Sequence, residues 1–322
     1  MPTITSTCLA TTTWPPLPSK PNKGTPLRYR IEHETRLIYD GPIWEHQCEL
    51  RLTPRQDEWL RLLDHSIDIY PEANPQVLRD GFGNPIHTVS LLPRHTRFVT
   101  RMRAEVETLR ANPFAFEPLP LDQESPWLAR RLAEEPRLRL FLGRSSLTPN
   151  LAPMSEAYGP FPERDRQLPL GEAIMKAMGW IQERLRYDPD ATHVHSGLEL
   201  VFQEGGGVCQ DFAHLLIALI RGWGYPARYV MGYQDPGNTP HQKGAAPNQA
   251  THAWIEALVP GVGWMGFDPT NLLAVNDLYI PVAVGRDSTD TPPQRGCFRG
   301  GASERMEIAV RVTPIRSDEV GV

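Results

Sequence analysis

The alternation of side chains in the first part of the chain predicts β-structure. Residues 29–52 contain two series of alternate positions whose neighbours in the sequence are mostly charged or polar. The turn sequence Asp40-Gly41-Pro42 separates the two series. The first series is Ile31, His33, Thr35, Leu37 and Tyr39, and the second is Trp44, Cys48, Leu50 and Leu52. Because a period of two places one series on one face of a sheet, we expect a hairpin here.

A second alternating segment extends this β-rich region. Phe98, Thr100, Met102, Ala104 and Val106 share one face and charged residues occupy the other. Burial of one face only is typical of antiparallel sheets, so we predict an antiparallel β domain over residues 27–112. Residues 1–26 are rich in Thr, Pro and Ser and are expected to form a flexible tail. Residues 113–165 are rich in proline and are expected to form a connector with one helix near 125–134.

From residue 166 the pattern changes to that of helices. Residues 170–187 carry an apolar stripe, and Ser196 and Glu199 have capping-box spacing for a short helix. Residues 208–221 are apolar almost all round, which predicts a buried helix, and strands are expected at 226–234, 251–259 and 263–269. The stripe consists of Ile174, Ala177, Met178, Ile181 and Leu185. The fold class is therefore α+β, with a core over residues 166–322 in which this helix packs against an antiparallel sheet and to which the C-terminal strands also belong.

The composition and charge of the chain argue against several classes of protein. The 322 residues carry a net charge of −5, and the positive charges are spread out, which argues against nucleic-acid and membrane partners. The four cysteines, at positions 8, 48, 209 and 297, form no CxxC pair and are expected to be reduced thiols. The chain has no apolar segment of membrane-spanning length and no signal-peptide pattern at its start, so we expect a cytoplasmic protein.

Cys209 has a position that favours thiolate chemistry. It follows Gly205-Gly206-Gly207 and falls in the first turn of the predicted buried helix. Free N–H groups and the helix dipole stabilise an anion there, and the Cys209 amide could donate a hydrogen bond to an oxyanion. The glycines would leave space for a substrate carbonyl. The alternative is a small buried hydrophobic residue, which is the usual role of a free cysteine.

His252 and Asp268 are predicted to meet across a hairpin. The turn falls around Pro260 to Gly263, and an odd number of loop residues would place both side chains on one face. The carboxylate could then orient one imidazole nitrogen while the other faces Cys209, as in acyl-transfer enzymes. Alternatively, His252 could be a structural strand residue, and Asp268 could cap the Asp-Pro-Thr-Asn turn.

Several stretches together resemble the bacterial transglutaminase-like family, within the papain-like cysteine superfamily. They are residues 207–233, 250–271 and 279–293, while residues 29–42 and 80–84 resemble the β domain that precedes the core in that family. The resemblance covers the chain from Leu27 to its end. It implies that Cys209 is the nucleophile, His252 the general base and acid, and Asp268 the orienting carboxylate. Gln203, six residues before the cysteine, has the papain-type spacing of a second oxyanion donor; the alternative is a solvated residue at the end of a helix.

These observations predict a thiol enzyme that acts on peptide or protein amide bonds without cofactor or metal. Water as the acyl acceptor would make it a peptidase or amidase, and an amine would make it a transglutaminase. A non-catalytic binding protein remains the alternative from another class. A zinc hydrolase with Cys209 as a ligand is a third, although the histidines at 193 and 195 lack further ligands at a suitable spacing.

Overall fold

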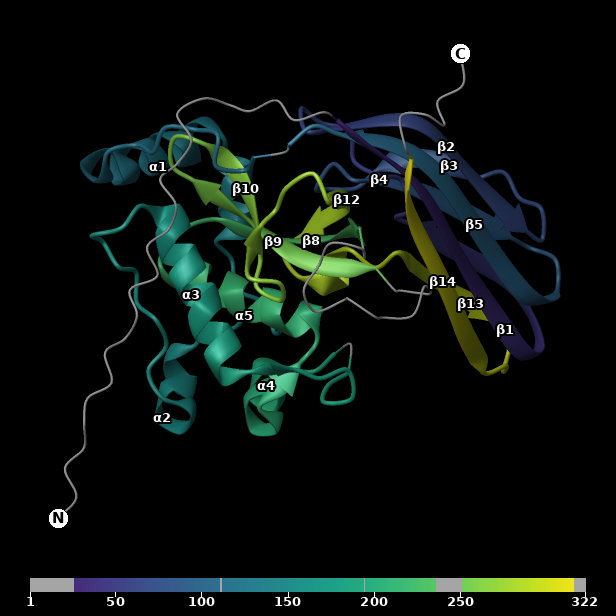
Figure 1. Cartoon of the computed structure of the whole chain (residues 1–322). Coiled ribbons are helices and arrows are strands. Elements are labelled where there is room, and N and C mark those ends of the chain that lie inside the picture. Colours follow the sequence, from purple (N-terminus) through teal and green to yellow (C-terminus); the bar gives the residue numbers. More distant parts are fainter. Residues whose placement is uncertain (1–25, 111, 194, 236–250, 316–322) are drawn as a thin grey trace.

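The computed structural model describes residues 26–110, 112–193, 195–235 and 251–315, which form an α+β molecule. The predicted tail and Cys8 lie outside these ranges. Figure 1 shows the strands of a large first sheet on one side, the helices on the other, and a smaller core sheet between them. The predicted fold class, an antiparallel β region followed by a core of helices and antiparallel strands, is confirmed. No helix in the described ranges is both long and apolar enough to cross a membrane.

The first sheet has the strand order β2-β5-β1-β4-β3, with β13 and β14 also pairing with β1. Its strands are β1 (Leu27–Leu50), β2 (Leu60–Tyr70), β3 (Gln76–Arg79), β4 (Pro85–Leu91), β5 (His95–Thr108), β13 (Gln294–Arg299) and β14 (Glu304–Ile315). The sequence pattern indicated β5 and the alternation in β1 but did not reveal β2, whose alternation is interrupted by a register shift between Leu62 and Asp64.

The predicted hairpin at Asp40-Gly41-Pro42 is wrong, because β1 is a single strand of 24 residues that passes through this turn sequence. Its first part pairs with β5 and β14, and its second part pairs with β4 and β13. The register against β5 shifts between Ile38 and Ile43, so the segment forms an irregularity in the strand. Strand β1 continues through this segment because it changes its pairing partners there, although Pro42 has no N–H to donate to a neighbouring strand.

The C-terminal strands pair with β1 in the first sheet, whereas the sequence pattern assigned them to the core region of residues 166–322. β14 pairs with β1 from Arg28↔Ile315 to Tyr39↔Glu304, and β13 pairs with the second part of β1. Figure 1 shows β13 and β14 lying beside β1, far from the helices. The alternation of residues 306–315 predicts a strand, but it carries no information about which strand becomes its partner.

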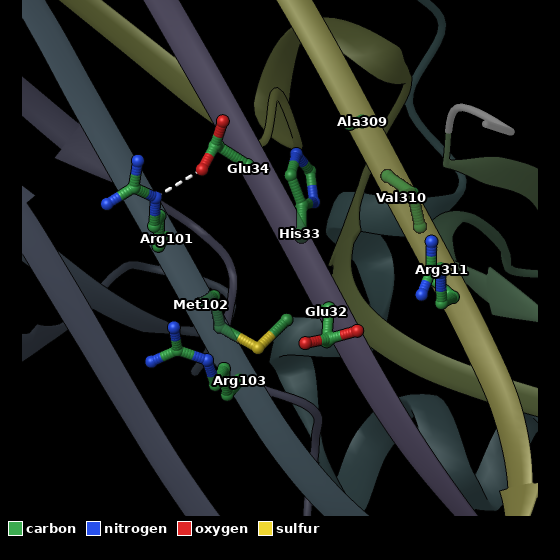
Figure 2. Close-up of a pocket in the computed structure, with 9 residues that line it drawn as sticks. All are labelled: Glu32, His33, Glu34, Arg101, Met102, Arg103, Ala309, Val310 and Arg311. Atoms are coloured by element: carbon green, nitrogen blue, oxygen red, sulfur yellow. Dashed lines mark hydrogen bonds and ion pairs between the residues drawn. The ribbon is translucent and has the colours of Figure 1, made fainter.

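The outer face of the first sheet is covered by charged side chains that largely neutralise one another. A shallow depression of about 310 Å³ lies on this face. Figure 2 shows Glu32 and Glu34 on β1 among arginines of the neighbouring strands β5 and β14. Arg101 on β5 donates a hydrogen bond to Glu34, and Arg103 pairs with Asp68 on β2. The inner face carries the apolar and histidine side chains and packs on the rest of the molecule.

The core sheet has the strand order β11-β10-β9-β8-β12, and helix α5 packs on β8 and β9. Its strands are β8 (Ala227–Gln234), β9 (His252–Val259), β10 (Gly263–Asp268), β11 (Leu273–Ala274) and β12 (Tyr279–Gly285). The α-helices are α1 (Leu121–Glu134), α2 (Ser155–Tyr158), α3 (Leu170–Arg184), α4 (Leu198–Glu204) and α5 (Cys209–Gly222). Short 3-10 helices are Pro136–Phe141, Ala152–Met154 and Ser288–Asp290, and β6 (Arg186–Tyr187) pairs with β7 (Gly206–Gly207).

The predicted helices form, but one predicted cap does not. The apolar stripe of α3 is buried, and α5 buries residues on every side, as its composition indicated. The capping box at Ser196 and Glu199 is absent, because α4 begins after Gly197 without a side-chain cap. The Ser196 hydroxyl instead accepts a hydrogen bond from the His193 N–H, closing the turn before the helix.

The first sheet is fixed to the core sheet through strands β8 and β12. His33 on β1 hydrogen-bonds to the Tyr233 hydroxyl at 2.9 Å, and the Tyr29 hydroxyl donates to Asp235 at 3.2 Å. Burial lowers the pKa of His33 to about 4, so the ring is neutral in this contact. Asn84, which follows β3, bonds to both backbone groups of Val284 on β12. These contacts hold the first sheet against the core sheet at β8 and β12.

Candidate active site

The glycines before Cys209 are required by the packing of the chain itself. Gly205 ends α4 with φ of 62°, a conformation that favours glycine. A Cβ atom at Gly207 would lie 2.6 Å from a carboxylate oxygen of Asp211. The space expected for a substrate carbonyl at this glycine is therefore occupied by a side chain from the first turn of α5.

Asp211 holds the turn that leads into Cys209. Its Oδ2 accepts hydrogen bonds from the Thr192 hydroxyl at 2.6 Å and from the Val208 N–H at 2.9 Å. Burial raises the pKa of Asp211, although both hydrogen bonds act in the opposite direction. Cys209 is the first residue of α5 and is only partly buried, so its sulfur stands at the positive end of a helix that is otherwise enclosed.

The hairpin of β9 and β10 places His252 and Asp268 on one face. Val259 pairs with Gly263, which leaves the three residues 260–262 in the turn, an odd number as the prediction required. Phe267 pairs with Ile255, so Asp268 lies opposite Trp254. Trp254 is two residues from His252 along β9, and both side chains therefore lie on the same face. The two side chains are diagonal neighbours, and the distance from His252 Nε2 to Asp268 Oδ2 is 2.8 Å.

The imidazole of His252 lies between a carboxylate and a thiol. Asp268 engages Nε2 of the ring, and Cys209 lies near enough to the same imidazole to contribute to its pKa. Burial would lower the pKa of His252, but the charge and hydrogen bond of Asp268, with a contribution from Cys209, raise it to about 10. The structure thus brings together the three side chains that sequence analysis singled out, and it favours a protonated imidazole beside the sulfur.

Asp268 is surrounded by donors that the sequence analysis missed. Besides His252, its Oδ2 accepts hydrogen bonds from Asn271 Nδ2 and from the Tyr279 hydroxyl, each at 2.7 Å. Its Oδ1 accepts from the backbone N–H groups of Thr270 at 2.8 Å and Asn271 at 3.3 Å. The Asp-Pro-Thr-Asn turn, considered from sequence as an alternative to a chemical role, therefore coexists with the His252 contact. In the sequence, the asparagine three residues after Asp268 was the feature that could have indicated one of these donors.

These hydrogen bonds keep Asp268 ionised. The side chain is fully buried, which alone would raise the pKa of its carboxyl group. His252, Asn271 and Tyr279 outweigh this effect and lower the pKa. The site therefore combines a buried carboxylate, an imidazole with a raised pKa and a partly accessible thiol.

Gly232 and Trp254 form the floor beneath His252. Gly232 pairs with His252, and a Cβ atom there would lie 2.3 Å from the Ile280 carbonyl oxygen and 2.5 Å from Trp254. The fully buried Trp254 ring lies edge-on to Tyr279, with 5.2 Å between ring centroids. Trp264 packs on Arg228 at the opposite end of β10 from Asp268.

Gln203 is exposed near the end of α4, and the hydrogen bonds described above for His252 and Asp268 do not involve it. His214 is buried in α5 and accepts a hydrogen bond from the Ser288 N–H at 3.2 Å. Within the described ranges, no cluster of three or more His, Cys, Asp or Glu side chains could hold a metal ion.

Comparison with known proteins places the chain in a family. Residues 163–269 match the model of the transglutaminase-like superfamily core, and residues 29–107 match that of the bacterial transglutaminase-like N-terminal region. An uncharacterized protein of Mycobacterium leprae is 30% identical over 287 residues, which cover 89% of this chain and 98% of that protein. The chain belongs to the bacterial transglutaminase-like family. The resemblance read from its motifs is confirmed.

Two further relatives of this transglutaminase-like chain differ in the activity that their names state. A protein-glutamine gamma-glutamyltransferase of Pseudomonas aeruginosa is 33% identical over 87 residues, covering 27% of this chain and 13% of that protein. A crystal structure from Cytophaga hutchinsonii, of a protein provisionally named a cysteine protease, has a TM-score of 0.69 at 22% identity. It covers 92% of this chain and 93% of its own, and it establishes a shared fold.

Proposed function

We propose that this protein is a cysteine-dependent hydrolase of peptide or amide bonds that works through a thioester acyl-enzyme. One observation carries the proposal: a single imidazole, His252, bonds to the buried Asp268 carboxylate through Nε2 and lies near enough to the Cys209 thiol for the thiol to contribute to its raised pKa. A nucleophile, a base and an orienting group in this order are the arrangement that acyl-transfer chemistry requires.

The chemistry balances with these three side chains alone. The Cys209 thiolate attacks the amide carbonyl carbon, and its backbone N–H at the start of α5 is available to stabilise the oxyanion. As the C–N bond breaks, the His252 imidazolium gives its proton to the departing amine and a thioester remains. Water then attacks the thioester, His252 takes its proton, and the products are a carboxylic acid and the free enzyme. Asp268 keeps the ring oriented and stabilises its charge in both steps.

Hydrolysis is the favoured outcome, and acyl transfer to an amine is the second candidate. The similarity of fold to a protein named as a cysteine protease spans nearly the whole chain and supports hydrolysis. The match to the gamma-glutamyltransferase of Pseudomonas aeruginosa supports transfer, but it covers only 27% of this chain. Both reactions share the thioester, so the choice depends on which acceptor reaches it.

The first test of the proposal needs no substrate. The purified protein is treated with iodoacetamide at pH 6, and mass spectrometry follows each cysteine-containing peptide separately. We expect Cys209 to react at least tenfold faster than the exposed Cys297, which serves as the internal control, and we expect His252→Ala to remove this difference. Equal rates at the two cysteines, or no effect of His252→Ala, would favour a non-catalytic binding protein.

The second test distinguishes the two acyl acceptors. A peptide library is incubated with the protein in the presence and absence of a primary amine, and product masses are recorded. Free carboxylic acids under both conditions indicate a hydrolase, whereas amine adducts as the main product indicate a transferase. Cys209→Ala should abolish every product, and Cys297→Ala should leave all of them unchanged.

A further inference from the structure

One oxygen of Asp268 accepts three side-chain hydrogen bonds, of which only one comes from the proposed base. His252 Nε2, Asn271 Nδ2 and the Tyr279 hydroxyl all lie 2.7–2.8 Å from Oδ2. The other oxygen accepts only backbone N–H groups. The two additional donors therefore converge on the atom that faces the imidazole, although satisfying a buried carboxylate requires no such concentration on one oxygen.

Both additional donors are held in place by buried contacts. Asn271 is 5% exposed, and its amide also donates to Gln234 Oε1 at 3.4 Å. Tyr279 is 2% exposed, and its backbone pairs with that of Gln234. Burial and the nearby Asp268 charge raise the pKa of Tyr279 far above its usual range. The hydroxyl is therefore protonated at neutral pH, and it acts as a donor to Asp268.

We propose that Tyr279 and Asn271 are positioning residues that act through Asp268, by dispersing the negative charge on the one carboxylate oxygen that binds His252. Three donors share the lone pairs of Oδ2, so each weakens the bond that the oxygen makes to the others. Without this sharing, a fully buried carboxylate would bind the imidazolium so strongly that release of the proton to a leaving amine would be slowed. The inference rests on the proposed function for the importance of that proton transfer.

The direction of the effect follows from the groups that face His252. Asp268 on β10 and Cys209 on α5 are its charged or ionisable neighbours, and Tyr279 on β12 is the third titratable group within reach. Removing a neutral donor from Oδ2 leaves more negative charge on that oxygen, and this charge stabilises the protonated imidazole of His252. The titration midpoint of His252 should therefore rise, whereas loosening of the carboxylate without this effect would lower it.

The test measures the titration of His252 directly by NMR of protein with ¹³C-labelled histidine. The variants are made on a Cys209→Ala background, so the midpoint reports the Asp268 contact without a second titrating group. We expect Tyr279→Phe to raise the midpoint by about half a pH unit or more, and Asn271→Leu to raise it in the same direction. Neither substitution changes the shape of its buried site greatly.

The matched control is Tyr29→Phe, which removes a buried tyrosine hydroxyl that bonds to Asp235 and not to Asp268. It should leave the His252 midpoint unchanged. A midpoint that is unchanged or lower in Tyr279→Phe would overturn the inference, and so would an equal rise in Tyr29→Phe. Because the experiment uses no substrate and lacks the Cys209 thiol, a negative result would leave the proposed thiol chemistry unaffected. A negative result in the alkylation test would likewise not decide whether Tyr279 and Asn271 act on Asp268.

Discussion

Single residues of the site are constrained by space as much as by chemistry. Glycine at position 232 is required because the Ile280 carbonyl oxygen and the Trp254 ring occupy the place of a side chain, and Gly207 is constrained in the same way by Asp211. His252 and Asp268 are constrained by charge, since the positive charge of the imidazolium compensates the negative charge of the buried carboxylate. A substitution at the first kind of residue disturbs packing, and one at the second kind disturbs electrostatics.

Substitution Gly232→Ala should destabilise the protein by roughly 1–3 kcal/mol, because β12 or Trp254 must move to admit the methyl group. It should also slow iodoacetamide labelling of Cys209, since Gly232 pairs with His252. Chemical denaturation measures the first effect. The control is Gly179→Ala in α3, where a Cβ atom meets nothing within 4 Å, and which should be neutral or stabilising. Equal losses in the two variants would contradict the steric argument.

The charge on His252 gives stability a specific dependence on pH. The folded pKa, at about 10, lies above the ordinary value of 6.5, so the contribution is complete below pH 6.5 and is lost as the pH rises through 10. The free energy of unfolding of the wild type should therefore exceed that of His252→Gln most at pH 6, and the difference should shrink towards pH 10. Denaturant titrations at several pH values measure it. A difference that grows with pH would refute the protonated pair.

At the scale of elements, α5 is fixed at both ends by polar groups. Asp211 secures the first turn, and Arg221 secures the last, where it is buried and its pKa is lowered by burial to about 10. The guanidinium of Arg221 donates to the carbonyl oxygens of Phe141, Gly143, Ala227 and Arg286 and to the Thr148 hydroxyl. One side chain thereby ties the connector and two strand ends to the helix that carries Cys209.

Substitution Arg221→Met should cost on the order of 3–5 kcal/mol of stability, because several buried acceptors lose their donor at once. Urea denaturation followed by tryptophan fluorescence is the measurement. Arg184→Met is the matched control, since Arg184 also lies in the last turn of a helix, α3, but is exposed. It should change stability by no more than about 0.5 kcal/mol. A similar small change for Arg221→Met would show that the buried network contributes little.

Over the whole molecule, the first sheet and the core are joined because the chain leaves the first sheet after β5, forms the core and returns to the first sheet with β13 and β14. Strands from both ends of the described chain build the first sheet, and buried hydrogen bonds join it to β8 and β12. Asn84 contributes most directly, since its side chain donates to the Val284 carbonyl at 2.7 Å and accepts from the Val284 N–H at 2.8 Å. It takes the place of a neighbouring strand for β12.

Substitution Asn84→Ala should lower stability by roughly 2–4 kcal/mol, because it leaves two buried backbone groups of Val284 without partners. We expect calorimetry to change from one unfolding transition to two, with the first sheet separating from the core. The control Asn150→Ala removes an exposed asparagine that accepts a single backbone hydrogen bond at 3.4 Å, and it should have little effect. A single transition with unchanged midpoint in Asn84→Ala would argue that other contacts maintain the junction.

The sequence by itself determined the elements that bury one face or all faces, because periodicity and composition are local properties. It predicted α3, α5, β5 and the core strands β8, β9 and β10, and it made the placement of His252 and Asp268 on one face depend on the parity of the β9–β10 turn, which the structure shows to be odd. The family was also readable, since its motifs are short and lie in the same order. The three candidate residues could therefore be named in advance.

Only the tertiary structure decided how distant segments meet. Partner exchange turned the Asp40-Gly41-Pro42 turn sequence into part of one long strand, and pairing across the chain moved β13 and β14 into the first sheet. The convergence of Asn271 and Tyr279 on Asp268 likewise depends on how β12 lies beside β8. Contacts of this kind join residues that no local pattern relates, so the physical environment of the site appears only when the whole chain is folded.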